Sequence, residues 1–281
     1  MLYLLLAIAS SAMVSICMRL SERHIHNNMV MFTANYAVCL AMSWFYMEGG
    51  GLFAAGDGML WAVALGVVSG FLYLGSFVVL QKSIRDNGVI LSSAAMKLGG
   101  VLVPVLIAVL FFRERLVWLR TLGVGIAIAA IALMNLERGE VGKGGKVHWL
   151  IVLLVGSGLA DAMANIYDKT GSAAFKDHYL FYTFLAALLL AFLAALWKRK
   201  ALKPADVLCG LLIGIPNYYS ARFLLLALGG VPAVVAYPVY SVSTIIVISA
   251  VGVLGFREKL STQKKWAMLL ILAALVLLNL Q

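Results

Sequence analysis

The sequence has little charge, few acidic groups and little cysteine for its length. Only 12% of its 281 residues are charged, and 12 are acidic against 22 that are basic, whereas 63% are hydrophobic. An ordinary soluble domain is about 25% charged and about 45–50% apolar. A soluble fold of this size cannot bury so much apolar surface. We therefore expect an all-α integral membrane protein.

The groups that usually carry chemistry or metal binding are scarce. The three cysteines, Cys17, Cys39 and Cys209, lie in apolar runs and show no spacing of a disulfide framework or metal site. We find no nucleophile–base pair and no phosphate-binding glycine loop, so we expect neither an enzyme nor a cofactor. The net charge of +10 would suggest nucleic acid in a soluble chain. In the short loops of a membrane protein it reports orientation instead, and we expect no nucleic acid partner.

Long apolar runs alternate with short polar segments along the whole chain. A membrane-spanning helix needs about 20 apolar residues, so ten of them use about 200 residues and leave about 80 for loops. The pattern predicts ten transmembrane helices and no soluble domain. The predicted spans are 2–18, 29–47, 59–81, 88–112, 117–136, 148–167, 179–197, 206–228, 232–255 and 266–280.

The chain also contains an internal repeat. A shift of 144 residues superimposes glycines, asparagines and a Phe-Arg-Glu triplet without a gap. This repeat predicts two five-helix halves, 1–140 and 145–281. Because five is odd, the second half enters the membrane from the opposite side, as in the inverted repeats of many secondary transporters. The matches include Gly66 with Gly210, Gly70 with Gly214, Phe112-Arg113-Glu114 with Phe256-Arg257-Glu258, and Ala129-Ala130 with Ala273-Ala274.

Lysine and arginine are unevenly distributed between the predicted loops. Odd-numbered loops carry 15 of them and even-numbered loops carry 6. The positive-inside rule then predicts a multi-pass protein of the plasma membrane with odd-numbered loops in the cytoplasm and both termini outside. Glu114 and Glu258, which follow the fourth and ninth spans, are expected to cap the helices that come next.

These features resemble the drug/metabolite transporter superfamily, EamA type, over the whole chain. The resemblance implies a transporter with a central cavity lined by helices 1–4 and 6–9, and it leaves the substrate open. The chain departs from the family pattern at Ala94, where the second half has Pro238, at Lys97, and in its predicted external termini. The matching motifs are Phe112-Arg113-Glu114-Arg115-Leu116, Phe256-Arg257-Glu258-Lys259-Leu260 and Tyr237-Pro238-Val239.

Two ionisable residues lie deep inside predicted spans. Lys97 is near the middle of the fourth span, and Asp161 lies within the sixth. Charges inside hydrocarbon are costly and commonly mark function. One interpretation is that Lys97 contacts an anionic substrate group while Asp161 binds a proton or a substrate amine. The alternative is a fixed structural ion pair. Ser157, Asp161, Asn165 and Asp168 form one polar stripe at helical spacing.

Polar and aromatic residues of the third, eighth and ninth spans complete the candidate site. Pro216 frees a backbone carbonyl beside Asn217, which either replaces the lost hydrogen bond or faces the substrate. Asn35 is expected to form a helix-to-helix hydrogen bond. The predicted substrate-binding residues are Lys97, Asp161, Asn165, Asn217, Tyr218, Arg222, Tyr237, Tyr240, Ser241 and Tyr73.

The sequence therefore predicts a secondary active transporter that works by alternating access. Its expected partners are membrane lipid and a small polar organic metabolite bearing an anionic group, with proton coupling if Asp161 titrates. Two alternatives stay open: an exporter of aromatic or cationic compounds, and a membrane scaffold without transport activity. Import and export are both open, with efflux the commoner direction in the family, and so are the monomer and the homodimer.

Overall fold

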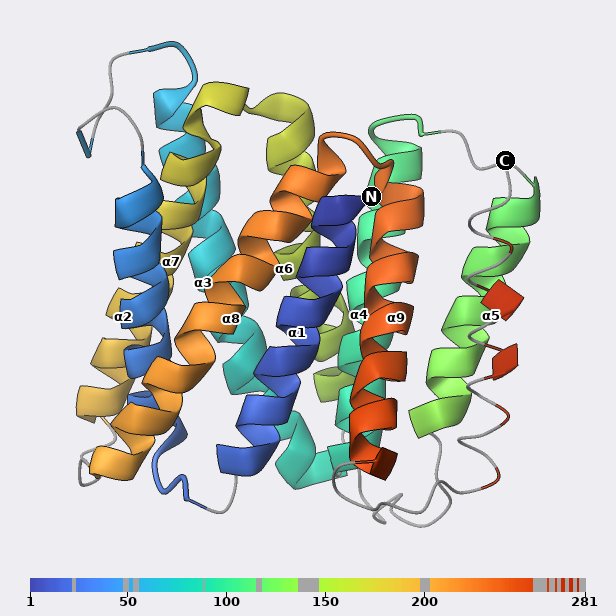
Figure 1. The fold of residues 1–281 in the computed structure, drawn as a ribbon, viewed down its shortest axis with the longest axis horizontal. Helices are drawn as coiled ribbons and strands as arrows, with labels where there is room; N and C mark the ends of the chain where they lie inside the picture. Colours follow the sequence, from blue (N-terminus) through green and yellow to red (C-terminus); the bar gives the residue numbers. More distant parts are fainter. Residues whose placement is uncertain are drawn as a thin grey trace. The chain divides into compact units, whose positions relative to one another are not determined.

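The computed structural model describes residues 1–21, 24–47, 51–52, 56–87, 89–114, 118–135, 147–197 and 203–254, together with 262, 266, 269–270, 273–274 and 277. Within these residues all regular structure is helical, as expected (Figure 1). The elements are α1 (Leu2–Ser21), α2 (Asn28–Tyr46), α3 (Met59–Asn87), α4 (Val89–Leu110), α5 (Trp118–Asn135), α6 (Val147–Thr170), the 3₁₀-helix η1 (Ala173–Phe175), α7 (Lys176–Trp197), α8 (Pro204–Leu228) and α9 (Ala233–Leu254).

The helix bounds follow the first nine predicted spans, with differences at the ends. The largest difference is in α3, which ends at Asn87 rather than at 81. Its last residues are polar, which shows that a helix can continue beyond the apolar run that identifies it. The predicted span 266–280 lies largely outside the described residues.

Several helices have the length and composition of membrane spans. Among the described residues, five helical stretches qualify, which supports the expectation of a membrane protein. They are Asn28–Tyr46, Met59–Leu80, His148–Thr170, Ala173–Trp197 and Pro204–Leu228.

The chain folds into two compact units. Unit 1 comprises Met1–Leu74 and Ile166–Gly229, and unit 2 comprises Gly75–Asn165 and Gly230–Gln281. The boundaries fall inside α3 and α6, so each of these helices contributes to both units. Each unit therefore contains segments from both predicted sequence halves.

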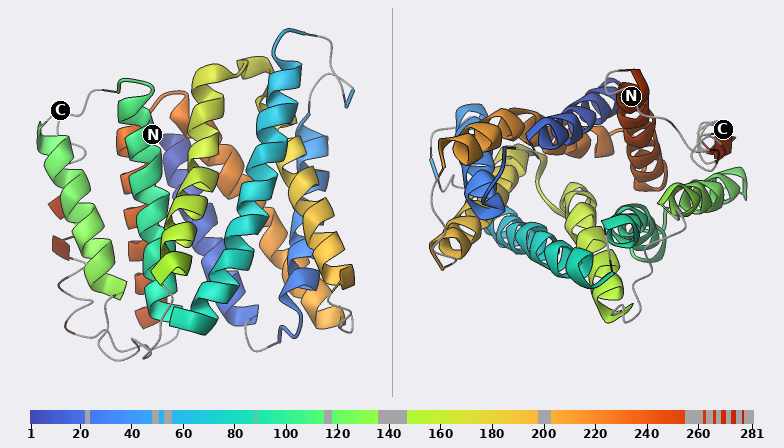
Figure 2. Two further views of the ribbon diagram at one scale, coloured as in Figure 1. Left: turned by 180° about the vertical axis from the view of Figure 1, so that it is seen from behind. Right: turned by 90° about the horizontal axis from the view of Figure 1, so that it is seen from below.

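In unit 1, α8 packs along α1 and α2, and α2 packs along α7 (Figures 1 and 2). Two pairs of glycines permit close packing, as expected. A Cβ atom at Gly70 would lie 2.5 Å from the carbonyl oxygen of Thr183 in α7. A Cβ atom at Gly214 would lie 2.6 Å from Cβ of Val38 in α2. These backbones approach each other because the glycines have no side chains.

In unit 2, α4 packs against α5 and α9, and α5 also contacts α9. A small apolar core joins these helices. It is formed by Val101, Ala130, Val242 and Ala274, with partly buried leucine and isoleucine side chains packed around it. Ala274 belongs to the predicted tenth span, so at least this residue packs in the core of unit 2.

The Phe-Arg-Glu motif forms the end of α4. Arg113 adopts a left-handed conformation with φ of 52°, and the N–H of Glu114 donates to the carbonyl of Ala108 at 3.0 Å. This sharp turn is typical of a helix C-terminus. Oε2 of Glu114 accepts a hydrogen bond from the N–H of Val234 at 3.1 Å. Glu114 thus binds the first turn of α9, whereas the sequence had suggested the next helix in the chain.

Candidate functional site

The predicted site residues are distributed over the two units, and each group is considered within its own unit. Unit 1 contains Tyr73 of α3 and three residues of α8: Asn217, Tyr218 and Arg222. Unit 2 contains the other six, which lie on α4, α6 and α9: Lys97, Asp161, Asn165, Tyr237, Tyr240 and Ser241.

In unit 2, Asp161 and Tyr237 are brought together. The hydroxyl of Tyr237 donates to the backbone carbonyl of Asp161 at 2.6 Å, which ties α9 to α6. Oδ2 of Asp161 lies against α4, where a Cβ atom at Gly100 would be 2.5 Å away. Lys97 lies in α4 by its backbone, but its side chain lies outside the described part of the structure. The proposed pairing of Lys97 with Asp161 therefore stays a prediction.

Asn165 lies one helical turn after Asp161 and is completely buried. Among the described residues, neither Oδ1 nor Nδ2 of Asn165 has a hydrogen-bond partner. Buried polar atoms are nearly always paired with protein, water or a ligand, so an unpaired carboxamide here indicates a place for a further polar group. Ser157, one turn before Asp161, donates instead to the carbonyl of Met96 in α4 at 3.2 Å.

The remaining predicted residues occupy half-buried positions. Tyr240 and Ser241 lie in α9, where the hydroxyl of Thr244 donates to the carbonyl of Tyr240 at 2.7 Å. Tyr73 lies in α3 within unit 1. Asp168, the last member of the polar stripe, forms an ion pair with Lys176 at 2.7 Å in unit 1. The stripe is thus divided between the two units.

In unit 1, Asn217 connects two apolar helices through a hydrogen bond. Its Nδ2 donates to Oδ1 of Asn35 in α2 at 3.2 Å and lies 3.7 Å from the sulfur of Cys39. The expected helix-to-helix bond of Asn35 is confirmed. Asn217 uses its amide for this contact, so it joins α8 to α2 beside the interruption that Pro216 creates.

Arg222 lies at the centre of a cluster of charged and aromatic groups. Its Nη1 atom contacts Oδ1 of Asp177 at 2.6 Å and donates to the hydroxyl of Tyr218 at 2.7 Å. The guanidinium stands 4.2 Å from the centre of the Tyr46 ring, a cation–π distance. Tyr46 also shares a 2.8 Å hydrogen bond with the hydroxyl of Tyr219. We call these five residues the Arg222 cluster.

Tyr46 and Asp177 were not among the predicted site residues. Tyr46 is the last residue of α2, and Asp177 lies in the first turn of α7, before the predicted span begins. An acidic residue is favoured there by the helix dipole, so its position has a simple structural explanation. The (i, i+4) spacing of Tyr218 and Arg222 was the one local signal of the cluster.

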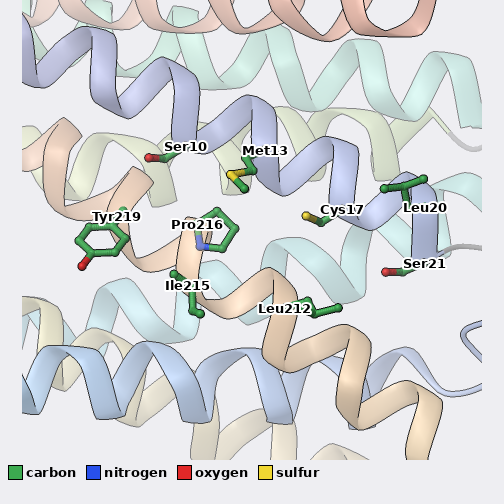
Figure 3. A pocket seen from close by; sticks show the side chains of 9 residues that line it. All are labelled: Ser10, Met13, Cys17, Leu20, Ser21, Leu212, Ile215, Pro216 and Tyr219. Carbon is green, nitrogen blue, oxygen red and sulfur yellow. The ribbon is translucent and has the colours of Figure 1, made fainter. Parts of the chain in front are cut away.

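A half-open cavity of about 360 Å³ lies between α1 and α8, and Met13, Leu20 and Leu212 on its wall are more than half exposed (Figure 3). Ser10, Met13 and Cys17 line it from α1, and Ile215, Pro216 and Tyr219 are among the residues that line it from α8. Its volume is within the range of small-molecule pockets, about 300–1,000 Å³. Leu212 also lines the cavity. Its backbone carbonyl receives no helical hydrogen bond from residue 216, four residues later, because Pro216 has no N–H.

Comparisons with known proteins establish a fold but no family. No family model matches the chain. A protein of Haemophilus influenzae described as uncharacterized is 25% identical over 274 residues, which cover 92% of this chain and 90% of that protein. A solved structure, titled only as the crystal structure of a protein, has a TM-score of 0.76 and 15% identity. It covers 99% of this chain and 95% of its own, so the fold exists in an experimentally determined protein.

Proposed function

We propose that the protein is a secondary transporter of the plasma membrane, of the EamA type, that moves a small organic metabolite bearing an anionic group. It works by alternating access, with ten transmembrane helices arranged as two inverted repeats. The substrate meets polar side chains held on apolar helices.

The observation that carries this proposal is the buried, unpaired carboxamide of Asn165. It lies in α6, a helix long and apolar enough to span a membrane, one turn from Asp161. An unpaired amide in such a place costs roughly 1–3 kcal/mol, so a purely structural role would remove it or pair it. A bound polar solute supplies the missing hydrogen bonds.

The inverted repeat is supported by two matching contacts inside unit 1. The atoms nearest a Cβ at Gly66 are a carbonyl oxygen, a Cβ and an amide nitrogen of α7, from Tyr179, Tyr182 and Thr183. Those nearest a Cβ at Gly210 are the same three kinds of atom in α2, from Met31, Ala34 and Asn35. Each α2 residue differs by 148 positions from its α7 counterpart. The glycines themselves are 144 positions apart, so the two predicted halves form contacts of the same kind.

The core of unit 2 supports the same symmetry. Ala130 and Ala274, which are 144 positions apart, pack in one cluster. Val101 and Ile245 of that cluster are related by the same shift. Repeat-related residues that pack together are expected where the halves of an inverted repeat meet.

An anionic substrate is favoured by the charges within the spans. Lys97 and Arg222 are cationic, and Asp161 is the carboxylate well inside a predicted span. Asp161 is the candidate group for proton coupling, since ionisable residues inside membrane spans commonly form proton pathways. Export of aromatic or cationic compounds is the second candidate, with Tyr237 and Tyr240 of α9 as the aromatic partners of a cation.

A thermal-shift screen of the purified protein against paired metabolites tests the proposal. Each carboxylate is compared with its uncharged amide. A ligand at about 100 times its Kd stabilises the native state by about 2.7 kcal/mol and raises the melting temperature. We expect carboxylates to raise it and amides to have little effect.

The variants Lys97→Ala and Lys97→Arg test whether stabilisation by carboxylates depends on the positive charge at residue 97. The alanine variant should lose the shift, and the arginine variant, which keeps the charge, should retain part of it. A confirmed carboxylate ligand that stabilises the Lys97→Ala protein as well as the wild type would contradict the role of Lys97. Stabilisation by organic cations alone would favour the second candidate.

A further inference from the structure

The cavity between α1 and α8 was not part of the predicted site, and its walls suit an apolar group. Met13, Leu20 and Ile215 provide aliphatic surface, while Ser10 and Ser21 are its small polar residues. All of its lining residues belong to unit 1. A small molecule with an apolar body fits this volume and composition.

One end of the cavity is close to the Arg222 cluster. Tyr219 lines the cavity and also shares a hydrogen bond with Tyr46, the residue whose ring lies beneath Arg222. Arg222 follows Tyr219 by three residues on α8, which corresponds to about 4.5 Å along the helix and nearly the same face. Tyr219 therefore belongs both to the wall of the cavity and to the Arg222 cluster.

Arg222 has hydrogen-bonding capacity that its protein partners do not use. Asp177 and Tyr218 both contact Nη1, and among the residues that the structure describes no hydrogen bond involves Nη2 or Nε. The arginine side chain is 18% exposed and that of Asp177 is 29% exposed, so both are accessible. The edge formed by Nη2 and Nε has the geometry that binds a carboxylate through two parallel hydrogen bonds.

We infer that unit 1 holds an amphipathic carboxylate, with its apolar body in the α1–α8 cavity and its carboxylate on Arg222 in competition with Asp177. A cation is disfavoured here. The ring of Tyr46 and the carboxylate of Asp177 are already occupied by the tethered guanidinium, which a ligand cation would have to displace. An anion can instead accept hydrogen bonds from Nη2 and Nε of Arg222. This inference does not depend on transport and applies equally to a protein that only binds the ligand.

Cys17 offers a direct test, because it lines the cavity, whereas Cys39 and Cys209 are buried. The labelling of Cys17 by N-ethylmaleimide is followed by mass spectrometry of the intact purified protein. The probes are 4-phenylbutyrate, its amide, and 4-phenylbutylamine, which share one apolar body. At about ten times its Kd, 4-phenylbutyrate should slow labelling roughly tenfold, because a bound site is protected in proportion to its occupancy. The amide and amine should protect far less.

Two substitutions should change the protection of Cys17 by 4-phenylbutyrate in opposite directions. Arg222→Gln should weaken protection by 4-phenylbutyrate roughly tenfold. Asp177→Asn removes the internal competitor and should strengthen protection severalfold, a gain that misfolding cannot produce. Asp168→Asn is the matched control, since it breaks the neighbouring ion pair with Lys176 and should leave protection unchanged.

Equal protection by all three probes would overturn the inference, because the cavity would then be a purely apolar groove. Preferential protection by the amine would also overturn it, and so would protection that is unaffected in both Arg222→Gln and Asp177→Asn. Failure to slow labelling at any soluble concentration counts against it as well. Transport is measured separately in liposomes, so the failure of one proposal is distinguishable from the failure of the other.

Discussion

Gly70 and Gly75 lie on the same helix, α3, but have very different surroundings. A Cβ atom at Gly70 would be 2.5 Å from the carbonyl oxygen of Thr183 and 2.7 Å from Cβ of Ala186. No described atom lies within 4 Å of a Cβ at Gly75. The Gly70→Ala change should therefore destabilise the protein by about 1–3 kcal/mol, since the clashing atoms belong to backbone and Cβ and cannot move freely. The melting temperature in detergent measures this loss.

Gly75→Ala is the control for Gly70→Ala. It adds the same methyl group to open space and replaces the residue with a better helix former, so it should leave the melting temperature unchanged or raise it. If both variants melt at the same temperature, the close approach of α3 and α7 is wrong.

Individual site residues were predictable where their signal is local. The hydrogen bond of Asn35 was predicted from the cost of an isolated amide in an apolar helix. The (i, i+4) spacing of Tyr218 and Arg222 would have indicated their contact, but the sequence analysis treated them as separate site residues. Tyr46 and Asp177 lie at helix ends, where polar and aromatic residues are ordinary. Their roles depend on packing between α2, α7 and α8, which no short-range pattern reveals.

At the scale of whole helices, the hydrogen bond between Asn35 and Asn217 is the best test of the contact between α2 and α8. Its length is 3.2 Å. Replacing either residue with leucine should destabilise the protein, because the other amide loses its partner. The double variant should lose less than the sum of the two single variants, with a coupling energy of about 0.6–1.7 kcal/mol. Equilibrium unfolding in mixed detergent micelles measures each variant, and strictly additive losses would contradict the contact.

The helices themselves were largely predictable, and their partners were not. Apolar runs of about 20 residues identify helices because a membrane span must satisfy its own backbone. The polar end of α3 shows the limit of that rule, since Lys82 and Arg85 continue the helix to Asn87. The binding of Glu114 to Val234 shows another limit. A carboxylate can cap any helix start that the fold brings near, and the sequence indicates only the nearest one in the chain.

For the molecule as a whole, the distribution of basic residues predicts which face lies in the cytoplasm. Lys203, just before α8, should be inside, and Gly230, just after α8, should be outside. Lys203→Cys and Gly230→Cys are introduced singly into a variant without natural cysteines. A membrane-impermeant maleimide should label Gly230→Cys in intact cells and should label Lys203→Cys only after the membrane is permeabilised. The opposite pattern would place the termini in the cytoplasm.

The sequence repeat predicts how many helices there are and how they are related, but not how they are grouped. Each compact unit draws on both halves of the repeat, and the unit boundaries cut through α3 and α6. Grouping of this kind depends on which apolar faces pack most closely. Glycine contacts and small core residues such as Ala130 and Ala274 decide that packing, and composition alone does not show it.

The proposed transporter must move a small organic anion across a membrane and not only bind it. Uptake into liposomes reconstituted with the purified protein tests it most directly, with radiolabelled carboxylates chosen from the thermal-shift screen and protein-free liposomes as the control. We predict saturable uptake that an excess of the same unlabelled carboxylate inhibits and that Lys97→Ala reduces. Ligands that bind and stabilise the protein but show no uptake or exchange above protein-free liposomes would contradict the claim and favour a membrane protein that binds without transporting.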